Sequence, residues 1–256
     1  MKRFMVVVLC IVVIAAGAGG AWWHYGHTGA KQPTTTAKTT TQAASTQPPK
    51  PSFDKTQYSL TDPNSIWVIV NKKNPLKPKT YVPNDLIFPT VPTRVPGNVS
   101  MQMRKVAGTA LETMFAGAKK DGINLMLSSG YRPYTFQQVL YNNYVASSGV
   151  AAADTFSARP GYSEHQTGLA ADIEPLSEKC DVDQCFANLP EGKWLAANAY
   201  KYGFVIRYPK GKDSVTGYEY EPWHVRYVGV EAATEMQKED VVTLETFFGL
   251  PPAPTY

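Results

Sequence analysis

The chain has 256 residues, of which 43% are hydrophobic and 12% aromatic, so it has enough apolar side chains for a packed core and is not wholly disordered. Its formal net charge of +4 originates in residues 1–52, which contain five Lys or Arg and no Asp or Glu. The remaining residues hold 20 basic and 21 acidic side chains, and this balance argues against a nucleic-acid-binding protein.

A run of apolar residues follows the two basic residues at positions 2 and 3. Residues 4–23 carry no charge, and a helix of this length extends about 30 Å, the thickness of the hydrocarbon core of a bilayer. Because the positive charges lie only on the N-terminal side, the rest of the chain is expected outside the cytoplasm. We predict that residues 1–27 form a single-pass membrane anchor. The alternative is a signal peptide cleaved near Ala16-Gly17-Ala18, which would make the protein secreted.

Residues 28–52 have the composition of a disordered linker. They contain ten Ser or Thr, four Pro and no aliphatic side chain larger than Ala. Such a segment has nothing to bury in a core. We therefore expect a Thr- and Pro-rich tether that leads to a folded domain formed by residues 53–256.

Cys180 and Cys185 are the only cysteines beyond residue 52. Outside the cytoplasm they would form a local disulfide, and closing so short a loop contributes about 2 kcal/mol in the chain-entropy description. A structural zinc site is one alternative, although two cysteines without a nearby histidine provide too few ligands. Free thiols are the other alternative, and we favour the disulfide.

The first half of the folded domain is expected to combine short strands with two helices. Residues 66–70 (IWVIV) have the composition of a strand, and the prolines that follow exclude a long element. Residues 100–120 place apolar side chains three and four positions apart, which predicts a helix. A short strand is expected at 123–127 and a second helix at 135–146.

The second half is expected to contain an antiparallel hairpin. Residues 204–208 and 218–228 flank a turn and have the pattern of its two strands. Helices and strands are mixed, and the hairpin favours antiparallel pairing, so we predict an α+β fold with a central antiparallel sheet flanked by helices. The other expected elements are a strand at 169–173 and helices at 191–201, 229–238 and 243–248.

Histidine is rare in the folded domain, which contains only His165 and His224. His165 precedes Asp172 by seven residues, with the flexible Gly168 between them, so a loop could lead from the first into a strand that carries the second. His224 would come from the neighbouring strand of the hairpin. Two imidazoles and one carboxylate, with a fourth position left to water, form a catalytic rather than a structural zinc site. The residues and their spacing indicate a zinc hydrolase, and histidines without a metal are an equally good alternative at this point.

Glu221 lies three residues before His224 and is the candidate general base. Positions i and i+3 of an ideal strand face opposite ways, so the two side chains share a site only if the backbone at Pro222 is irregular. Bound zinc lowers the pKa of its water to about 7, and a carboxylate within reach then collects the proton.

Four motifs occur in order along the folded domain: SGYRPYTFQ (129–137), GYSEHQTGLAAD (161–172), YGFVIRYPKGK (202–212) and TGYEYEPWHVRYVG (216–229). Together they closely resemble the VanY-type D-alanyl-D-alanine carboxypeptidases, zinc peptidases of bacterial cell-wall metabolism. The segment DPNSIWVIVNKKNPL (62–76) is also similar to this family. The resemblance implies the fold of the hedgehog and D-Ala-D-Ala-peptidase group.

The resemblance also implies a metal centre and a mechanism. One Zn²⁺ per chain would be held by His165, Asp172 and His224, with Glu221 as the catalytic base. A zinc-activated water would attack the last peptide carbonyl of the substrate. No covalent intermediate is needed in this mechanism.

The substrate-binding residues are implied in the same way. Arg132 and Gln137 would hold the terminal carboxylate of the substrate, and Ser163 would contribute to binding. A guanidinium suits this task because it donates two parallel hydrogen bonds to a carboxylate. Trp223 is expected to form a wall of the pocket, and for Arg207 we favour a structural ion pair over a role in catalysis.

The expected function is hydrolysis of the C-terminal D-Ala from peptidoglycan stem peptides by a D,D-carboxypeptidase. One alternative is an L,D-carboxypeptidase acting on tetrapeptide stems, and the other is a non-catalytic zinc-containing module that binds the cell wall. The expected partners are stem peptides and, through residues 1–27, the bacterial cell membrane. We expect a monomer that does not bind nucleic acid.

Overall fold

The computed structural model describes residues 53–256. The expected membrane anchor or signal peptide (1–27) and the expected linker (28–52) lie outside the described residues. Among residues 53–256, no helix combines the length and the apolar character needed to cross a bilayer.

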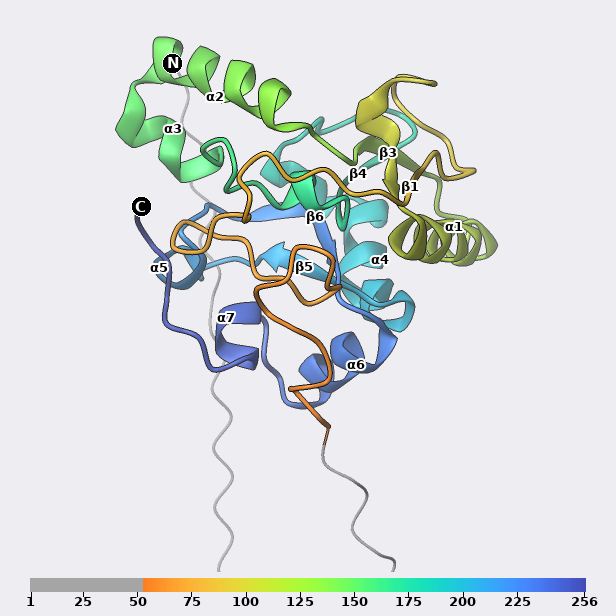
Figure 1. The fold of residues 1–256 in the computed structure, drawn as a ribbon. Helices are drawn as coiled ribbons and strands as arrows, with labels where there is room; N and C mark the ends of the chain where they lie inside the picture. The colour runs from red at the N-terminus through yellow and green to blue at the C-terminus, as the bar shows by residue number, and fades with distance from the viewer. Residues whose placement is uncertain (1–52) are drawn as a thin grey trace, which may run out of the picture. The chain divides into compact units, whose positions relative to one another are not determined.

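A four-stranded antiparallel sheet lies at the centre of the described part of the chain (Figure 1). Its strands, in spatial order, are β3 (Leu125–Ser129), β4 (Ala170–Pro175), β6 (Glu221–Tyr227) and β5 (Phe204–Tyr208). Every residue of the two central strands is buried, because the sheet is covered on both faces. The predicted α+β class with an antiparallel sheet and helices is confirmed.

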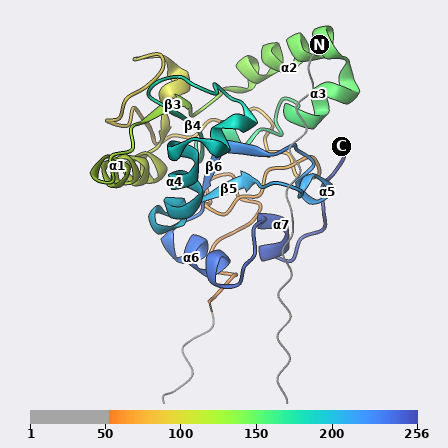
Figure 2. The same ribbon diagram turned by 180° about the vertical axis from the view of Figure 1, so that it is seen from behind.

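Helices surround the sheet. In both views α2 and α3 lie together at the top, and α6 and α7 lie at the bottom (Figures 1 and 2). Leu111 of α1 and Leu195 of α4 belong to the same buried cluster as Leu127 of β3. A smaller cluster is formed around α6 and α7. The helices are α1 (Lys105–Lys120), α2 (Tyr134–Ser148), α3 (Val150–Phe156), α4 (Pro190–Asn198), α5 (Asp213–Thr216), α6 (Val230–Lys238) and α7 (Leu244–Phe247).

The prediction of a helix over 100–120 is wrong in its first turn. Residues Val99–Met101 form a 3-10 helix instead, and β2 (Met103–Arg104) pairs with β1 (Leu86–Ile87) in a two-stranded sheet. The helix therefore begins at Lys105. Beyond that point the apolar spacing is followed, with one face of α1 buried.

The prediction of a strand at 66–70 is also wrong. Residues 66 and 67 belong to a turn, and although residues 67–70 are buried, the segment joins no sheet. Two of its carbonyl groups, those of Ile66 and Val68, accept hydrogen bonds from the Arg226 guanidinium at 3.1 and 2.8 Å. Side chains alternate between the two clusters: Val68 packs in the α1 cluster, whereas Trp67 packs in the α6–α7 cluster. The alternation that resembles a strand thus arises because the segment lies between two buried clusters.

The sequence patterns missed two helices, α3 and the short α5 inside the expected turn, and misplaced several ends. Gly149 adopts φ +81°, and α3 follows it as a separate helix that was not predicted. The helix expected at 191–201 is divided into α4 and a 3-10 helix, Ala199–Tyr202. The expected strand at 218–228 is shorter, since β6 begins at Glu221.

Four fully buried charged side chains form an ion-pair cluster next to the sheet. Arg207 donates to Glu164 at 2.8 Å and to both oxygens of Glu245 at 2.9 and 2.7 Å. Arg226 donates to the same Glu164 oxygen at 2.8 Å. We call these four residues the buried ion-pair cluster. Two positive and two negative charges balance one another within it, and Arg207 is part of an ion pair as expected.

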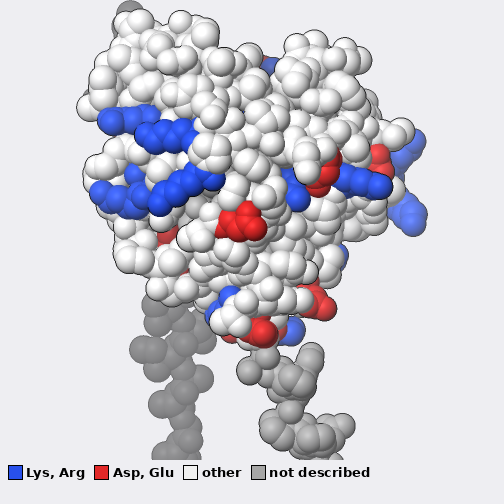
Figure 3. Space-filling view, viewed as in Figure 1, with Lys and Arg blue, Asp and Glu red and all other residues white. Residues whose placement is uncertain are grey.

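The surface is unevenly charged. On the face seen in Figure 3, Lys and Arg side chains gather at the left edge and again at the right edge, where acidic side chains lie beside them. Most of the rest of this face is uncharged.

Candidate active site

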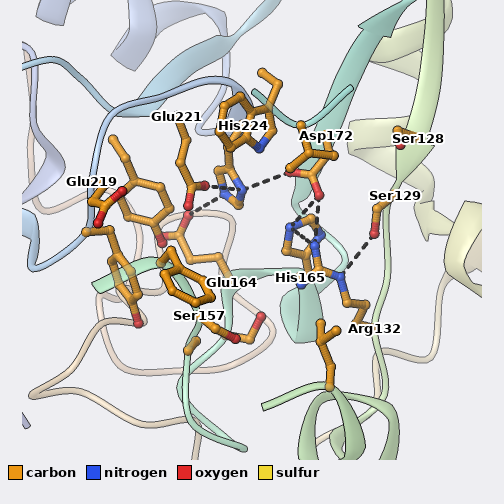
Figure 4. Close-up of a pocket in the computed structure, with 18 of the residues that line it drawn as sticks. Ser128, Ser129, Arg132, Ser157, Glu164, His165, Asp172, Glu219, Glu221 and His224 are labelled. Atoms are coloured by element: carbon orange, nitrogen blue, oxygen red, sulfur yellow. Dashed lines mark hydrogen bonds and ion pairs between the residues drawn. The ribbon is translucent and has the colours of Figure 1, made fainter. Parts of the chain in front are cut away.

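A pocket of about 810 Å³ lies at one end of the central sheet. Its walls come from β4 and β6, from the α2–α3 pair, and from the loop that contains residues 182–184. The side chains that meet in it are drawn in Figure 4. All three predicted metal ligands and the predicted base line this pocket.

His165, Asp172 and His224 converge although they are distant in sequence. His165 lies in a 3-10 helix (Glu164–Thr167) that ends at Gly168 with φ +68°. A side chain at Gly168 would come within 2.9 Å of Arg104, so the turn into β4 requires glycine. Asp172 and His224 are direct partners on β4 and β6. One ligand atom from each residue lies within 4.8 Å of the others, and we call the three the metal-ligand group.

The hydrogen bonds of His165 fix its tautomer. Its Nδ1 lies 2.6 Å from the carbonyl oxygen of Gly130, which can only accept, so Nδ1 carries the proton. Its Nε2 lies 2.8 Å from an Arg132 nitrogen, which can only donate. Burial, together with the nearby Arg132 charge, lowers the pKa of His165 to about 4. His165 is therefore neutral, with the Nε2 electron pair directed into the site.

His224 and Asp172 form a close pair on the adjacent strands. Nδ1 of His224 lies 3.1 Å from Oδ1 of Asp172. Burial alone would lower the pKa of His224, but the carboxylates of Asp172 and Glu164 raise it to about 9. Burial would raise the pKa of Asp172, yet the hydrogen bond with His224 and the positive charge of Arg132 hold it well below its usual range. Asp172 is thus a carboxylate that is ready to bind a cation.

Glu221 reaches the same site because β6 is irregular. Val225 pairs with Ile206 and Glu221 with Tyr208, so β6 advances four residues while β5 advances two. This register shift brings Oε2 of Glu221 to 3.6 Å from Nδ1 of His224. Burial, with a further contribution from Asp172, raises the pKa of Glu221 to about 8. The side chain is suited to take up and release a proton near neutral pH.

Arg132 and Gln137 lie together, but only Arg132 lines the pocket. Arg132 donates to Oδ2 of Asp172 at 2.8 Å, to Ser129 at 3.1 Å and to Oε1 of Gln137 at 3.3 Å. The Gln137 amide nitrogen donates to the carbonyl oxygen of Ala158 at 2.8 Å. Gln137 is almost completely buried. It therefore supports the Arg132 guanidinium from behind rather than facing the cavity.

The remaining predicted residues lie on the pocket walls. Ser163 and Trp223 both line the cavity and are largely buried. The structure joins Cys180 to Cys185 in a disulfide, with Cα atoms 5.6 Å apart. The loop that this bond closes contributes residues 182–184 to the pocket. The disulfide therefore shapes one wall of the site.

Glu164 is the site residue that the sequence analysis missed. It is fully buried beside His165, and its Oε2 lies 3.8 Å from Nε2 of His224 (Figure 4). Arg207 and Arg226 outweigh its burial and keep its pKa well below the usual range. The only signal in the sequence was its place inside the motif GYSEHQTGLAAD, where spacing gives no reason to single it out.

The donor set of the metal-ligand group fits a zinc ion. Nε2 of His165 carries an electron pair, Asp172 is ionised, and Nδ1 of His224 faces them. Two imidazoles and a carboxylate are borderline donors that zinc accepts, and His165 has the backbone hydrogen bond on its far nitrogen that is typical of a metal ligand.

Comparisons with known proteins agree with this geometry. The family model described as VanY, D-alanyl-D-alanine carboxypeptidase, matches residues 100–230. The protein YodJ of Bacillus subtilis (strain 168) is 46% identical over 191 residues, which are 74% of this chain and 69% of YodJ.

Two solved structures are similar in fold as well as in sequence. The LdcB LD-carboxypeptidase has a TM-score of 0.69 at 47% identity, covering 73% of this chain and 87% of that one. A variant of the D,D-pentapeptidase VanY from a VanB-type vancomycin resistance cassette, in complex with Zn(II), has a TM-score of 0.58 at 33% identity, covering 70% and 97%. The chain belongs to the VanY family of D-alanyl-D-alanine carboxypeptidases.

Proposed function

We propose that this protein is a zinc-dependent carboxypeptidase that removes the C-terminal D-Ala from peptidoglycan stem peptides ending in D-Ala-D-Ala. The observation that carries the proposal is the convergence of the metal-ligand group with Glu221, whose Oε2 lies 3.6 Å from Nδ1 of His224. His165, Asp172 and His224 would hold the ion. When bound, Zn²⁺ supplies Lewis-acid chemistry: it polarises a carbonyl and makes a water molecule more acidic.

Glu221 would move the proton in this reaction. Its pKa of about 8, raised by burial, lies close to neutral pH, where a general base that must later act as an acid works best. Oε2 would accept the proton of the attacking water and then deliver it to the nitrogen of the departing D-alanine. Glu221 would thus be used twice without forming a covalent bond to the substrate.

Arg132 would recognise the free carboxylate of the substrate. In the structure its guanidinium donates to Nε2 of His165 and to Asp172, atoms that would otherwise face a cation. A metal ion and a guanidinium compete for the same electron pairs, so occupation of the metal-ligand group would free Arg132 for the substrate. Gln137, which accepts from Arg132 at 3.3 Å, would keep the guanidinium in the pocket.

The test is D-alanine release from a pentapeptide that ends in D-Ala-D-Ala, measured with zinc, with a chelator, and with Glu221→Gln. The matched control is Glu219→Gln, since Glu219 also lines the pocket but is exposed and interacts with Thr155. We expect release that requires zinc and Glu221 and is retained in the control. If wild-type protein binds zinc but releases no D-alanine from any stem peptide, a cell-wall-binding module replaces the proposal.

A second candidate is an L,D-carboxypeptidase that acts on tetrapeptide stems. It is favoured by the 47% identity and the TM-score of 0.69 to the LdcB LD-carboxypeptidase. The same zinc centre and the same Arg132 would serve this reaction. Release of D-alanine from a tetrapeptide, and not from the pentapeptide, would select it.

We also propose that the reaction takes place outside the cytoplasm, at the bacterial cell membrane. The support is the uncharged run at residues 4–23, with basic residues only before it. Protease treatment of intact spheroplasts tests this location: an external domain is degraded while cytoplasmic proteins persist.

A further inference from the structure

Two buried atoms at the metal-ligand group lack hydrogen-bond partners. They are Oε2 of Glu164 and Nε2 of His224, and they face each other at 3.8 Å (Figure 4). Both side chains are at least 96% buried. Because buried polar atoms are nearly always hydrogen-bonded, this facing pair requires an explanation.

Glu164 is held rigidly as an anion. Its other oxygen, Oε1, accepts from Arg207 and from Arg226, each at 2.8 Å. These two guanidinium groups belong to the buried ion-pair cluster and fix both the position and the charge of the carboxylate. Oε2 is left as an acceptor that points at the outer edge of the His224 ring.

His224 needs such an acceptor. Its Nδ1 lies 3.1 Å from Oδ1 of Asp172 and 3.6 Å from Oε2 of Glu221, so Nδ1 is the nitrogen that faces the site. Without a metal ion, Nδ1 carries a proton, because the ionised Asp172 can only accept. When a cation takes the place of that proton, the neutral imidazole has its electron pair on Nδ1 and its remaining proton on Nε2. That proton points at Glu164.

We propose that Glu164 is a positioning residue for His224. Its Oε2 accepts a hydrogen bond from the Nε2–H group of His224 and thereby keeps the Nδ1 electron pair directed at the metal. This inference rests on the proposed function, because it assumes that His224 binds zinc. It assigns opposite tasks to neighbouring residues, since His165 binds the ion directly while Glu164 orients the other imidazole. Partners that orient ligand imidazoles typically change metal affinity about 10–100-fold when they are removed.

Glu164→Gln gives a directional test. Arg207 and Arg226 accept no hydrogen bonds, so they hold the amide oxygen of the new side chain and turn its NH₂ toward Nε2 of His224. A donor at that place favours the electron pair on Nε2 and the proton on Nδ1, the tautomer that cannot bind the metal through Nδ1. The matched control is Glu245→Gln, which removes a charge from the same cluster but does not face His224.

The experiment measures zinc affinity of the full chain by competition with a chromophoric chelator, for wild type and both variants, with folding checked by circular dichroism. We expect Glu164→Gln to bind zinc about 10–100-fold more weakly and Glu245→Gln to stay within about twofold of wild type. Equal affinities for Glu164→Gln and wild type overturn the inference but leave the proposed function intact. A wild-type protein that binds no zinc overturns both.

A second measurement uses only the wild type and so does not depend on the folding of a variant. In zinc-loaded protein labelled with ¹⁵N, the Nε2 proton of His224 is expected to exchange slowly with solvent and to resonate far downfield, as a proton hydrogen-bonded to a carboxylate does. An Nε2 proton that exchanges rapidly, or a ring bound to zinc through Nε2, overturns the inference.

Discussion

The buried ion-pair cluster and the metal-ligand group lie side by side. They meet in the chain at Glu164, which belongs to the cluster, and at the next residue, His165, which belongs to the metal-ligand group. In the cluster, opposite charges are equal in number and contact one another at hydrogen-bonding distance. At the metal-ligand group, His165 has a pKa lowered to about 4, and the neighbouring Glu221 has one raised to about 8. Both regions are buried, so burial alone does not distinguish structural charges from reactive ones. The difference is that each charge of the cluster has an opposite charge at hydrogen-bonding distance, whereas Glu221 pairs with His224 only at 3.6 Å.

The largest expected effect that separates the two regions is that of Glu221→Gln. Its kcat/KM for D-alanine release should fall about 10³-fold, because the proton acceptor is lost. The thermal midpoint should not fall. The folded protein already disfavours the anionic form of Glu221, whose pKa is raised to about 8, and Gln has the same shape as the neutral acid. Kinetics and calorimetry of the metal-free protein check both. A lowered midpoint with full activity would place Glu221 among the structural charges.

Next in size is Arg226→Met, in the cluster. It removes hydrogen bonds to Glu164 and to the carbonyls of Ile66 and Val68 and leaves a buried carboxylate with one partner fewer. We expect a loss of about 3–5 kcal/mol in the free energy of unfolding, measured with urea. The control is Arg159→Met, whose partly exposed pair with Asp154 should cost less than about 1 kcal/mol. Equal losses would mean that the cluster contributes no more than a surface pair.

Zinc binding should depend on pH through the site and not through the cluster. His224 has a pKa of about 9 in the metal-free protein, and its protonated form cannot bind zinc. As pH rises from 7 to 9 the neutral form increases, so the apparent affinity should rise about tenfold per unit and level off above 9. Glu164 stays ionised throughout this range. Calorimetric titrations in several buffers check this, and a flat profile would contradict it.

The smallest effect is expected for Arg132→Lys. A lysine keeps the positive charge but loses the fork that pairs with both carboxylate oxygens, so KM should rise about 10–30-fold with a small change in kcat. Steady-state kinetics on the pentapeptide measure the two constants separately. A change confined to kcat would show that Arg132 acts on the reacting bond and not on the terminal carboxylate.

The residues of the metal-ligand group could be singled out in the sequence because histidine is rare in the domain and each of His165 and His224 lies in a polar motif. The contact between Glu221 and His224 depends on the register shift between β5 and β6, which no local pattern announces. The spacing of the two residues indicates only that the backbone between them must be irregular if they share a site. Glu164 was overlooked for a similar reason, since its partners Arg207 and Arg226 are far away in the chain.

The fold was predictable where periodicity reflects packing against one core. The apolar face of α1 is buried as its spacing indicates. Periodicity failed at 66–70, because alternation reports which way side chains point and not what the backbone pairs with. It also failed before Lys105, where pairing of β2 with β1 overrides the helical pattern.

The buried segment at 66–70 has a mechanical consequence. Force applied at Phe53 reaches the α6–α7 cluster first, because Phe53 and Trp67 both pack there. It then reaches the hydrogen bonds from Arg226 to the segment, and Arg226 lies on β6, the strand that carries His224. A pull on the N-terminal end of the domain would therefore load the α6–α7 cluster before it loads the strand beside the pocket.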